Sequence, residues 1–234
     1  MRLGLLPIMD TILTPEPFRK QCNFGYNQKI LLRDVADGEI LIAMSIPNSI
    51  TNPSLRGHFL IAMPSLQQGF FAHALIYLCE HNEEGAMGLM INQAIDLGLH
   101  QLLRHLDLEP VDTLPERPIF RGGPVQPEHG FVLHPADTRW VGTRVLDDAR
   151  ALTTSRDILE AIALNQGPDD LLIALGYAGW GPGQLEYELA ENAWLVVPAD
   201  DRILFNLPPG QRWQAASRLI GIDMNLISQD AGHA

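Results

Sequence analysis

Short apolar runs separated by turn-forming residues recur along the chain from residue 57 onward. The runs HFLIAMP, HALIYLCEH and GAMGLMINQ each have the length and composition of a buried strand, and Pro64 ends the first of them. The residues NEEG join the second run to the third, which predicts a β-hairpin. Further short strands are expected within PIFRGGPV, HGFVLH and DLLIALG.

Three other segments show the spacing of amphipathic helices, namely LGLHQLLRHLDL, TTSRDILEAIALNQG and GQRWQAASRLIG. The second is the strongest, because Thr154 or Ser155 can cap its start, Asp157 completes a capping-box pattern with Thr154, and Gly167 can end it. Strand runs outnumber helices, and several neighbouring runs are hairpin-like. We therefore predict an α+β fold, a single compact domain with a mixed, mostly antiparallel sheet and packed helices.

The first part of the chain differs from the rest. The segment SIPNSITNPS is typical of a linker, and Pro7 and Asp10 interrupt the N-terminal apolar run that a signal peptide would need. We expect residues 1–53 to be an N-terminal extension and linker, and residues 54–234 to be the domain. Met44 is the expected functional start, so that residues 1–43 are either outside the native product or a flexible tail.

Composition and charge narrow the classes of function. The formal net charge is −12 and no basic run occurs, so we expect no direct contact with nucleic acid or with an anionic membrane. Both lysines, Lys20 and Lys29, precede residue 30, which excludes a Schiff-base or P-loop lysine from the rest of the chain. Two cysteines, Cys22 and Cys79, make no disulfide framework, and a cytoplasmic location is expected.

The stretch GYAGWGPGQLEYELAENAW (176–194) resembles a phosphate-binding turn between a strand and a helix. The dinucleotide pattern fails, however, because Gln184 and Glu186 occupy the two positions where a third glycine is needed. Glu186 and Glu188, in the first turns of the expected helix, would also repel a phosphate. The glycines then indicate either a tight crossover with close backbone approach or a binding surface around Trp180, since an aromatic residue on a glycine loop is often exposed.

Other residues give weaker signals for a catalytic, metal or anion-binding site. Cys79 and His81 lie two apart on an expected strand, a spacing that usually holds two side chains too far apart for a direct bond, and Cys79 suits a core position. The eight histidines show no metal-ligand spacing, so we expect no metal and no cofactor, although a metal site assembled from distant segments stays open. Arg121 in RGGPV can hold a carboxylate or phosphate, or it can pair with a neighbouring acid.

The segments HFLIAMP, HNEEGAMGLMIN, RGGPV, GFVLH, LTTSRDILEAIA, GYAGWGPGQLEYELAENAWL and the terminal GHA occur together in one order. In these seven segments the chain, from about Leu55 to Ala234, resembles the AlgH family of YqgE-type bacterial proteins. The resemblance implies a compact α+β domain, a cytoplasmic protein and a name linked to transcriptional regulation of alginate production. It implies no catalytic residues, because none are established for the family.

The leading hypothesis is a non-enzymatic regulatory or binding protein that affects transcription indirectly, through an unknown protein or small-molecule partner. Turns carry function more often than cores, so the expected binding residues are Gly179, Trp180, Gly181, Gly183, Asn92, Arg121, Gly122 and Gly123. The alternative is an enzyme that acts on a small molecule in a cleft with a histidine or Cys79 as its reactive group. Direct DNA binding is a third reading.

Overall fold

A computed structural model of the chain describes residues 54–63 and 69–221. The expectations for residues 1–53, including the start at Met44, lie outside these residues. In chain order the elements are β1 (His58–Ala62), β2 (Leu75–Asn82), β3 (Gly85–Met90), β4 (Ala94–Gly98), α1 (Leu99–His105), β5 (Pro118–Arg121), β6 (Val125–Pro135), β7 (Thr143–Val145), β8 (Arg150–Thr153), α2 (Arg156–Ala163), β9 (Leu172–Trp180), α3 (Gln184–Ala190), β10 (Trp194–Pro198), the π-helical turn η2 (Arg202–Asn206) and α4 (Pro209–Arg218).

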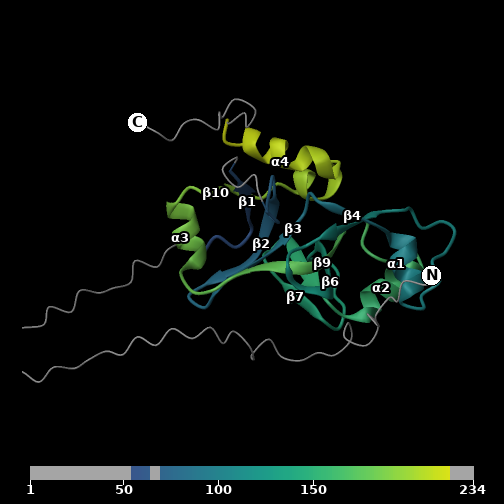
Figure 1. Cartoon of the computed structure of the whole chain (residues 1–234). Helices are drawn as coiled ribbons and strands as arrows, with labels where there is room; N and C mark the ends of the chain where they lie inside the picture. The colour runs from purple at the N-terminus through teal and green to yellow at the C-terminus, as the bar shows by residue number, and fades with distance from the viewer. Residues whose placement is uncertain (1–53, 64–68, 222–234) are drawn as a thin grey trace, which may run out of the picture.

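The strands form one curled sheet that is organised around β9 (Figure 1). The main strand order is β10-β1-β2-β3-β9-β6-β8-β7, and β4 and β5 pair beside it. Along one edge, β9 pairs first with β5 in parallel and then with β3 antiparallel, while β6 pairs along its other edge. The prediction of a mixed, mostly antiparallel sheet in a single α+β domain is confirmed, with β5–β9 as the parallel pair among those described.

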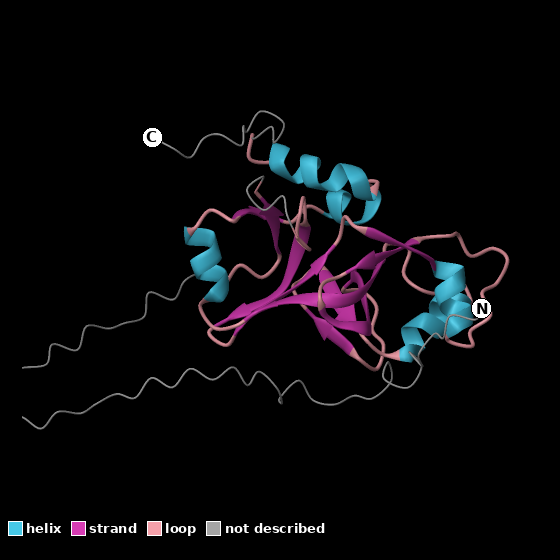
Figure 2. Cartoon of the chain, viewed as in Figure 1, coloured by secondary structure: helices cyan, strands magenta, loops and turns pink. Residues whose placement is uncertain are grey.

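Three apolar clusters give the domain its layers. The largest lies inside the curl and joins side chains of both halves of the sheet to η2 and α4. A second lies between β6, β9 and the helices α1 and α2, and the third lies between β1–β3, β9, β10 and α3. Figures 1 and 2 show the result, with α3 at one end of the strands, α1 and α2 at the other, and α4 across the top.

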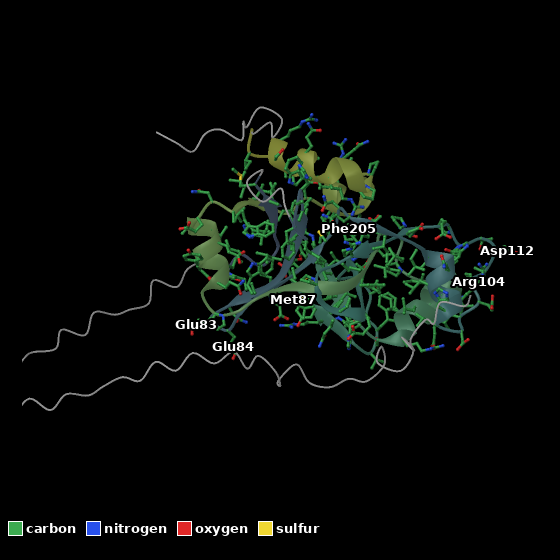
Figure 3. All side chains as sticks on the ribbon, in the orientation of Figure 1. Glu83, Glu84, Met87, Arg104, Asp112 and Phe205 are labelled. Carbon is green, nitrogen blue, oxygen red and sulfur yellow. The ribbon has the colours of Figure 1, made fainter. Side chains whose placement is uncertain are left out.

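The predicted hairpin is present as β2 and β3, with Asn82 opposite Gly85 and a bulge between Leu78 and Glu80. The carboxylates of Glu83 and Glu84 project from its turn at the α3 end of the molecule, while Arg104 and Asp112 mark the opposite end (Figure 3). The three helices predicted from amphipathic spacing are present as α1, α2 and α4, and the helix expected after the glycines is present as α3.

Two local expectations are corrected by the structure. The N-cap of α2 is Ser155, whose hydroxyl donates to the Asp157 carboxylate and accepts the backbone N–H of Gly142. It accepts no N–H of the helix itself, and the expected capping box with Thr154 does not form. The helix ends at Ala163, where Asn165 takes the left-handed conformation expected of Gly167. Asparagine tolerates this conformation because its short polar side chain bonds locally.

No helix in the described part of the chain is long and apolar enough to cross a membrane.

Candidate functional site

The glycine-rich stretch is mostly strand. We expected a strand, then a turn beginning near Gly176, but β9 continues through Trp180 and only residues 181–183 form the turn. Gly176 bends this long strand with a φ of +70°, and Gly183 precedes α3 with a φ of +73°. Both angles favour glycine because a Cβ destabilises left-handed backbone.

Gly122 and Gly123 cross the middle of β9 in backbone contact. A Cβ on Gly122 would overlap the carbonyl oxygen of Gly176, and one on Gly123 would overlap the peptide between Tyr177 and Ala178. The amide N–H of Gly122 donates to the Leu175 carbonyl at 2.8 Å. These glycines allow the chain after β5 to approach β9 closely. Close backbone approach is what the sequence led us to expect at the glycines of β9.

Trp180 is buried, with only 6% of its surface exposed. Its indole N–H donates to Oε2 of Glu188 at 2.8 Å, and the indole of Trp194 donates to the same oxygen at 2.8 Å. Gln184 donates to the other oxygen, Oε1, at 3.0 Å. The exposed aromatic residue that the glycines suggested is therefore not found, because α3 covers Trp180 and satisfies its polar atom.

A row of aromatic rings connects Trp180 to Arg121. Edge-to-face contacts run from Trp180 to Trp194 at 6.0 Å, to Phe71 at 5.7 Å and to Phe70 at 5.2 Å between ring centroids. The guanidinium carbon of Arg121 then lies 5.6 Å from the centroid of the Phe70 ring. Two residues far apart in the sequence, Arg121 and Trp180, are thus the two ends of one packed array.

Asn92 holds the loop that carries Phe70. Its side-chain oxygen accepts the Leu75 N–H at 2.8 Å, and its amide donates to the His73 carbonyl at 2.8 Å. The neighbouring Gln93 donates to the Ala72 carbonyl at 3.1 Å. The oxygen and one N–H of the Asn92 amide thus bond the protein's own backbone, which holds this loop in place.

Arg121 is exposed and has no carboxylate partner within the described residues. Phe70 beneath it is 36% exposed. On the same loop, His73 has a φ of +53°, and its ring meets that of Trp213 on α4 at 4.9 Å. We call Phe70, His73, Arg121 and Trp213 the Arg121 surface.

The structure thus brings some of the expected residues together and separates others. Asn92, Arg121, Gly122 and Gly123 share one region, where β3 and β5 end. The turn 181–183 lies at the far end of β9, roughly 15 Å along the strand from Gly176 at about 3.3 Å per residue. Sequence reasoning missed Phe70, His73 and Trp213, although the aromatic pair in GFFAH, just before a strand, was an available signal.

The candidate reactive groups Cys79 and His81 are not paired. Cys79 is fully buried, and this burial raises the pKa of its thiol well above the ordinary value. Nδ1 of His81 accepts the Leu55 N–H at 2.9 Å, and Nε2 donates to Glu186 at 2.8 Å. The thiol is thus a poor nucleophile in the folded protein, and His81 links β2 to α3.

Among residues 54–63 and 69–221 no three or more His, Cys, Asp or Glu side chains lie close enough together to hold a metal ion. His233 lies outside those residues.

The most buried histidine, His134, belongs to a chain of hydrogen bonds. Its Nδ1–H donates to the Pro135 carbonyl at 2.7 Å, and Nε2 accepts the hydroxyl of Thr153 at 2.8 Å. The hydroxyls of Thr153 and Thr143 are hydrogen-bonded to each other at 2.7 Å. The hydroxyl oxygen of Thr143 also accepts the backbone N–H of Trp140 at 2.7 Å. Every member has a partner, so the neutral imidazole fits this buried network.

Burial lowers the pKa of His134 below its ordinary value, and this outweighs the opposing effects of the Pro135 carbonyl and Asp137. The unfolded chain takes up its proton near pH 6.5 and the folded chain at lower pH. As pH falls below about 6.5 we expect stability to fall, by at most about 1.4 kcal/mol per pH unit, and above 6.5 the group has no effect. Urea unfolding of the wild type and His134→Gln from pH 5 to 8 measures this contribution as their difference.

A matched His58→Gln variant controls for histidine loss at a less buried position. If the difference between wild type and His134→Gln does not change with pH, the neutral network is contradicted.

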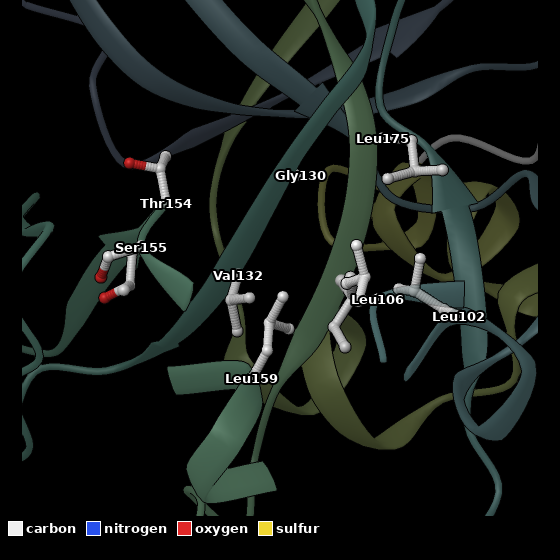
Figure 4. A pocket seen from close by; sticks show the side chains of 10 residues that line it. Leu102, Leu106, Gly130, Val132, Thr154, Ser155, Leu159 and Leu175 are labelled. Carbon is white, nitrogen blue, oxygen red and sulfur yellow. The ribbon is translucent and has the colours of Figure 1, made fainter. Parts of the chain in front are cut away.

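A small cavity lies between α1, α2, β6 and β9 (Figure 4). It measures about 20 Å³, enough for about one water molecule. Leu106, Val132 and Leu159 give it an apolar wall, and Thr154 and Ser155 lie at one end. This cavity leaves no room for a substrate or cofactor, which generally needs several hundred Å³.

Comparison with known proteins gives consistent matches over the described domain. The model of a family described as AlgH-like matches residues 59–225. A UPF0301 protein from Thioalkalivibrio sulfidiphilus is 54% identical over 191 residues, covering 82% of this chain and 100% of the relative. A UPF0301 protein from Methylococcus capsulatus is 48% identical over 180 residues, covering 76% and 96%.

Two solved structures are similar. The solution structure of the AlgH protein from Pseudomonas aeruginosa matches with a TM-score of 0.63 and 48% identity, covering 79% of this chain and 98% of that one. A protein from Corynebacterium diphtheriae matches with a TM-score of 0.57 and 19% identity, covering 73% and 89%, which shows a shared fold.

Proposed function

The chain belongs to the AlgH-like family, and from this premise we propose that it is a non-enzymatic binding protein that acts through the Arg121 surface. The observation that carries the proposal is an exposed guanidinium resting on a half-exposed ring, with no acid beside it in the described part of the chain. Arginine and aromatic side chains dominate the energy of protein interfaces. An exposed arginine that is packed against a row of aromatic rings has the character of such a contact.

The rigidity of the surface supports the same proposal. Asn92 and Gln93 hold its loop, and the rings of Phe71 and Trp194 lie behind Phe70. A surface that is already ordered loses less conformational entropy when a partner binds. Gly122 and Gly123 contribute by positioning Arg121. The turn at Gly181 and Gly183, with Gly179 on the strand before it, is a second, separate part of the proposed surface.

The enzyme alternative has less support in the geometry. Cys79 is enclosed in the core with a raised pKa, and the cavity beside Thr153 is about the size of one water molecule. A regulatory effect on transcription would then be indirect, through the bound partner. A cytoplasmic location, suggested by the absence of a disulfide framework in the sequence, is part of this proposal.

The test compares the tagged wild type, Arg121→Gln and Arg139→Gln in lysate of a bacterium that carries the gene. Arg139 is a matched control, because it is another exposed arginine without an ion pair in the described residues. We expect a partner that the wild type and Arg139→Gln retain and Arg121→Gln loses, with at least tenfold weaker binding to the purified partner. A partner that binds Arg121→Gln as well as the wild type would refute the assignment.

A further inference from the structure

We propose that the Arg121 surface binds an acidic linear segment of a partner protein, in which an aspartate or glutamate lies next to an apolar side chain. This inference rests on the proposed function and adds the chemistry of the partner.

The charge at the surface selects a single carboxylate. Arg121 presents one guanidinium without an ion pair among the described residues. The amides of Asn92 and Gln93 each donate one N–H to the carbonyls of His73 and Ala72, which directs them at the protein's own loop, and neither carries a positive charge. One arginine matches one carboxylate in charge and in bidentate geometry, whereas a dianionic phosphate usually takes several cations or a helix N-terminus.

The apolar part of the surface selects the neighbour of that carboxylate. Phe70 keeps 36% of its surface exposed beneath the guanidinium, and its other side packs on Phe71. An apolar side chain placed on this ring would exclude water from the ion pair. Partial exclusion of water strengthens the Coulomb attraction compared with an exposed pair.

The overall charge of the chain bears on the nature of the partner. A net charge of −12 repels a strongly acidic partner at long range, and this repulsion is screened beyond about 8 Å at physiological salt. The segment must therefore be recognised by local contact at Arg121, with few acidic residues outside it. This distinguishes it from a polyanion such as nucleic acid.

The first experiment selects a random 12-residue peptide library on the full-length wild-type protein and counter-selects it on Arg121→Gln. We expect enriched peptides that share an Asp or Glu beside an aliphatic or aromatic residue. Arg121→Gln should fold normally because Arg121 is exposed. Enrichment of peptides without acids, or no enrichment at all, would overturn the proposal.

The second experiment measures the affinity of one enriched peptide and of its twin with Gln replacing the acid, by fluorescence anisotropy. We expect the twin to bind wild type at least tenfold more weakly, and Arg121→Gln to bind both peptides equally weakly. This double-mutant cycle isolates the coupling between the two charges. Arg139→Gln should bind the acidic peptide like wild type, and independent losses from the two changes would contradict the ion pair.

The third measurement adds inorganic phosphate or acetate as competitors of the bound peptide at equal ionic strength. Equal or stronger competition by acetate supports carboxylate recognition, and clearly stronger competition by phosphate overturns it. The partner assay above separates the two proposals. If a partner requires Arg121 but binds equally well after its acids are replaced, the acidic segment is refuted and the binding function stands.

Discussion

Gly123→Ala is expected to destabilise the folded domain severely. A Cβ at this position would overlap the backbone between Tyr177 and Ala178 in the middle of β9. Because the obstacle is the backbone of a central strand, relief requires the sheet itself to shift. We expect the free energy of unfolding to fall by more than about 4 kcal/mol, a size that is typical of severe disruption of a protein core. Circular dichroism and urea unfolding of the purified variant would measure the loss.

Gly181→Ala is the matched control for this variant. Its Cβ would meet nothing closer than Oε1 of Gln184, at 3.9 Å, and its φ lies outside the left-handed region. We expect a change within about 0.5 kcal/mol, as at ordinary surface positions. Cooperative unfolding of Gly123→Ala at the wild-type urea midpoint would contradict the crossover in which Gly123 lies against β9.

Glu188→Ala is expected to destabilise the domain by about 3 kcal/mol, because it leaves the buried N–H groups of Trp180 and Trp194 without their shared acceptor. For a domain of this size, such a loss lowers the melting temperature by roughly 6–12 °C. The two indoles also report the change directly, through tryptophan fluorescence. Differential scanning calorimetry and the emission spectrum together measure it.

Two further variants distinguish the loss of the indole acceptor from the loss of a negative charge. Glu188→Gln keeps a carbonyl oxygen that can accept both indoles, so we expect it to recover most of the loss. Glu191→Ala removes an exposed acid at the end of α3 and should change stability by less than about 0.5 kcal/mol. Equal losses for Glu188→Ala and Glu191→Ala would show that charge, and not the indole acceptor, matters.

Local sequence patterns were sufficient to predict most of the helices and strands. The turn NEEG between two apolar runs predicted the β2–β3 hairpin, and the apolar stripe of TTSRDILEAIALNQG predicted α2. These elements depend on interactions within a few residues, which a sequence displays directly. The course of β9 was predicted less well, because Gly176 and Gly179 signal a turn locally whereas pairing with β3 and β6 keeps them in a strand.

The candidate site was only partly visible in the sequence. Arg121 could be singled out as a charged residue beside two glycines, but whether an acid pairs with it depends on segments far away in the chain. Phe70 and Trp213 passed unnoticed because an aromatic residue near an apolar run usually belongs to the core. The prediction of an exposed Trp180 failed because the following helix, α3, covers the ring and supplies the acceptor for its N–H, Glu188.

By itself, the sequence determined the fold class, the family, the lack of a lysine after residue 29 and the failure of the glycines 176–183 to match a nucleotide pattern. These conclusions follow from residue identity and short-range spacing, which need no coordinates. Only the tertiary structure decided that Gly122 and Gly123 lie against β9 and that Trp180 is buried under α3. It also showed that a row of rings ends at Arg121, which has no ion pair among residues 54–63 and 69–221. Burial and pairing are properties of contacts between distant segments, and those contacts exist only after the sheet has curled around β9.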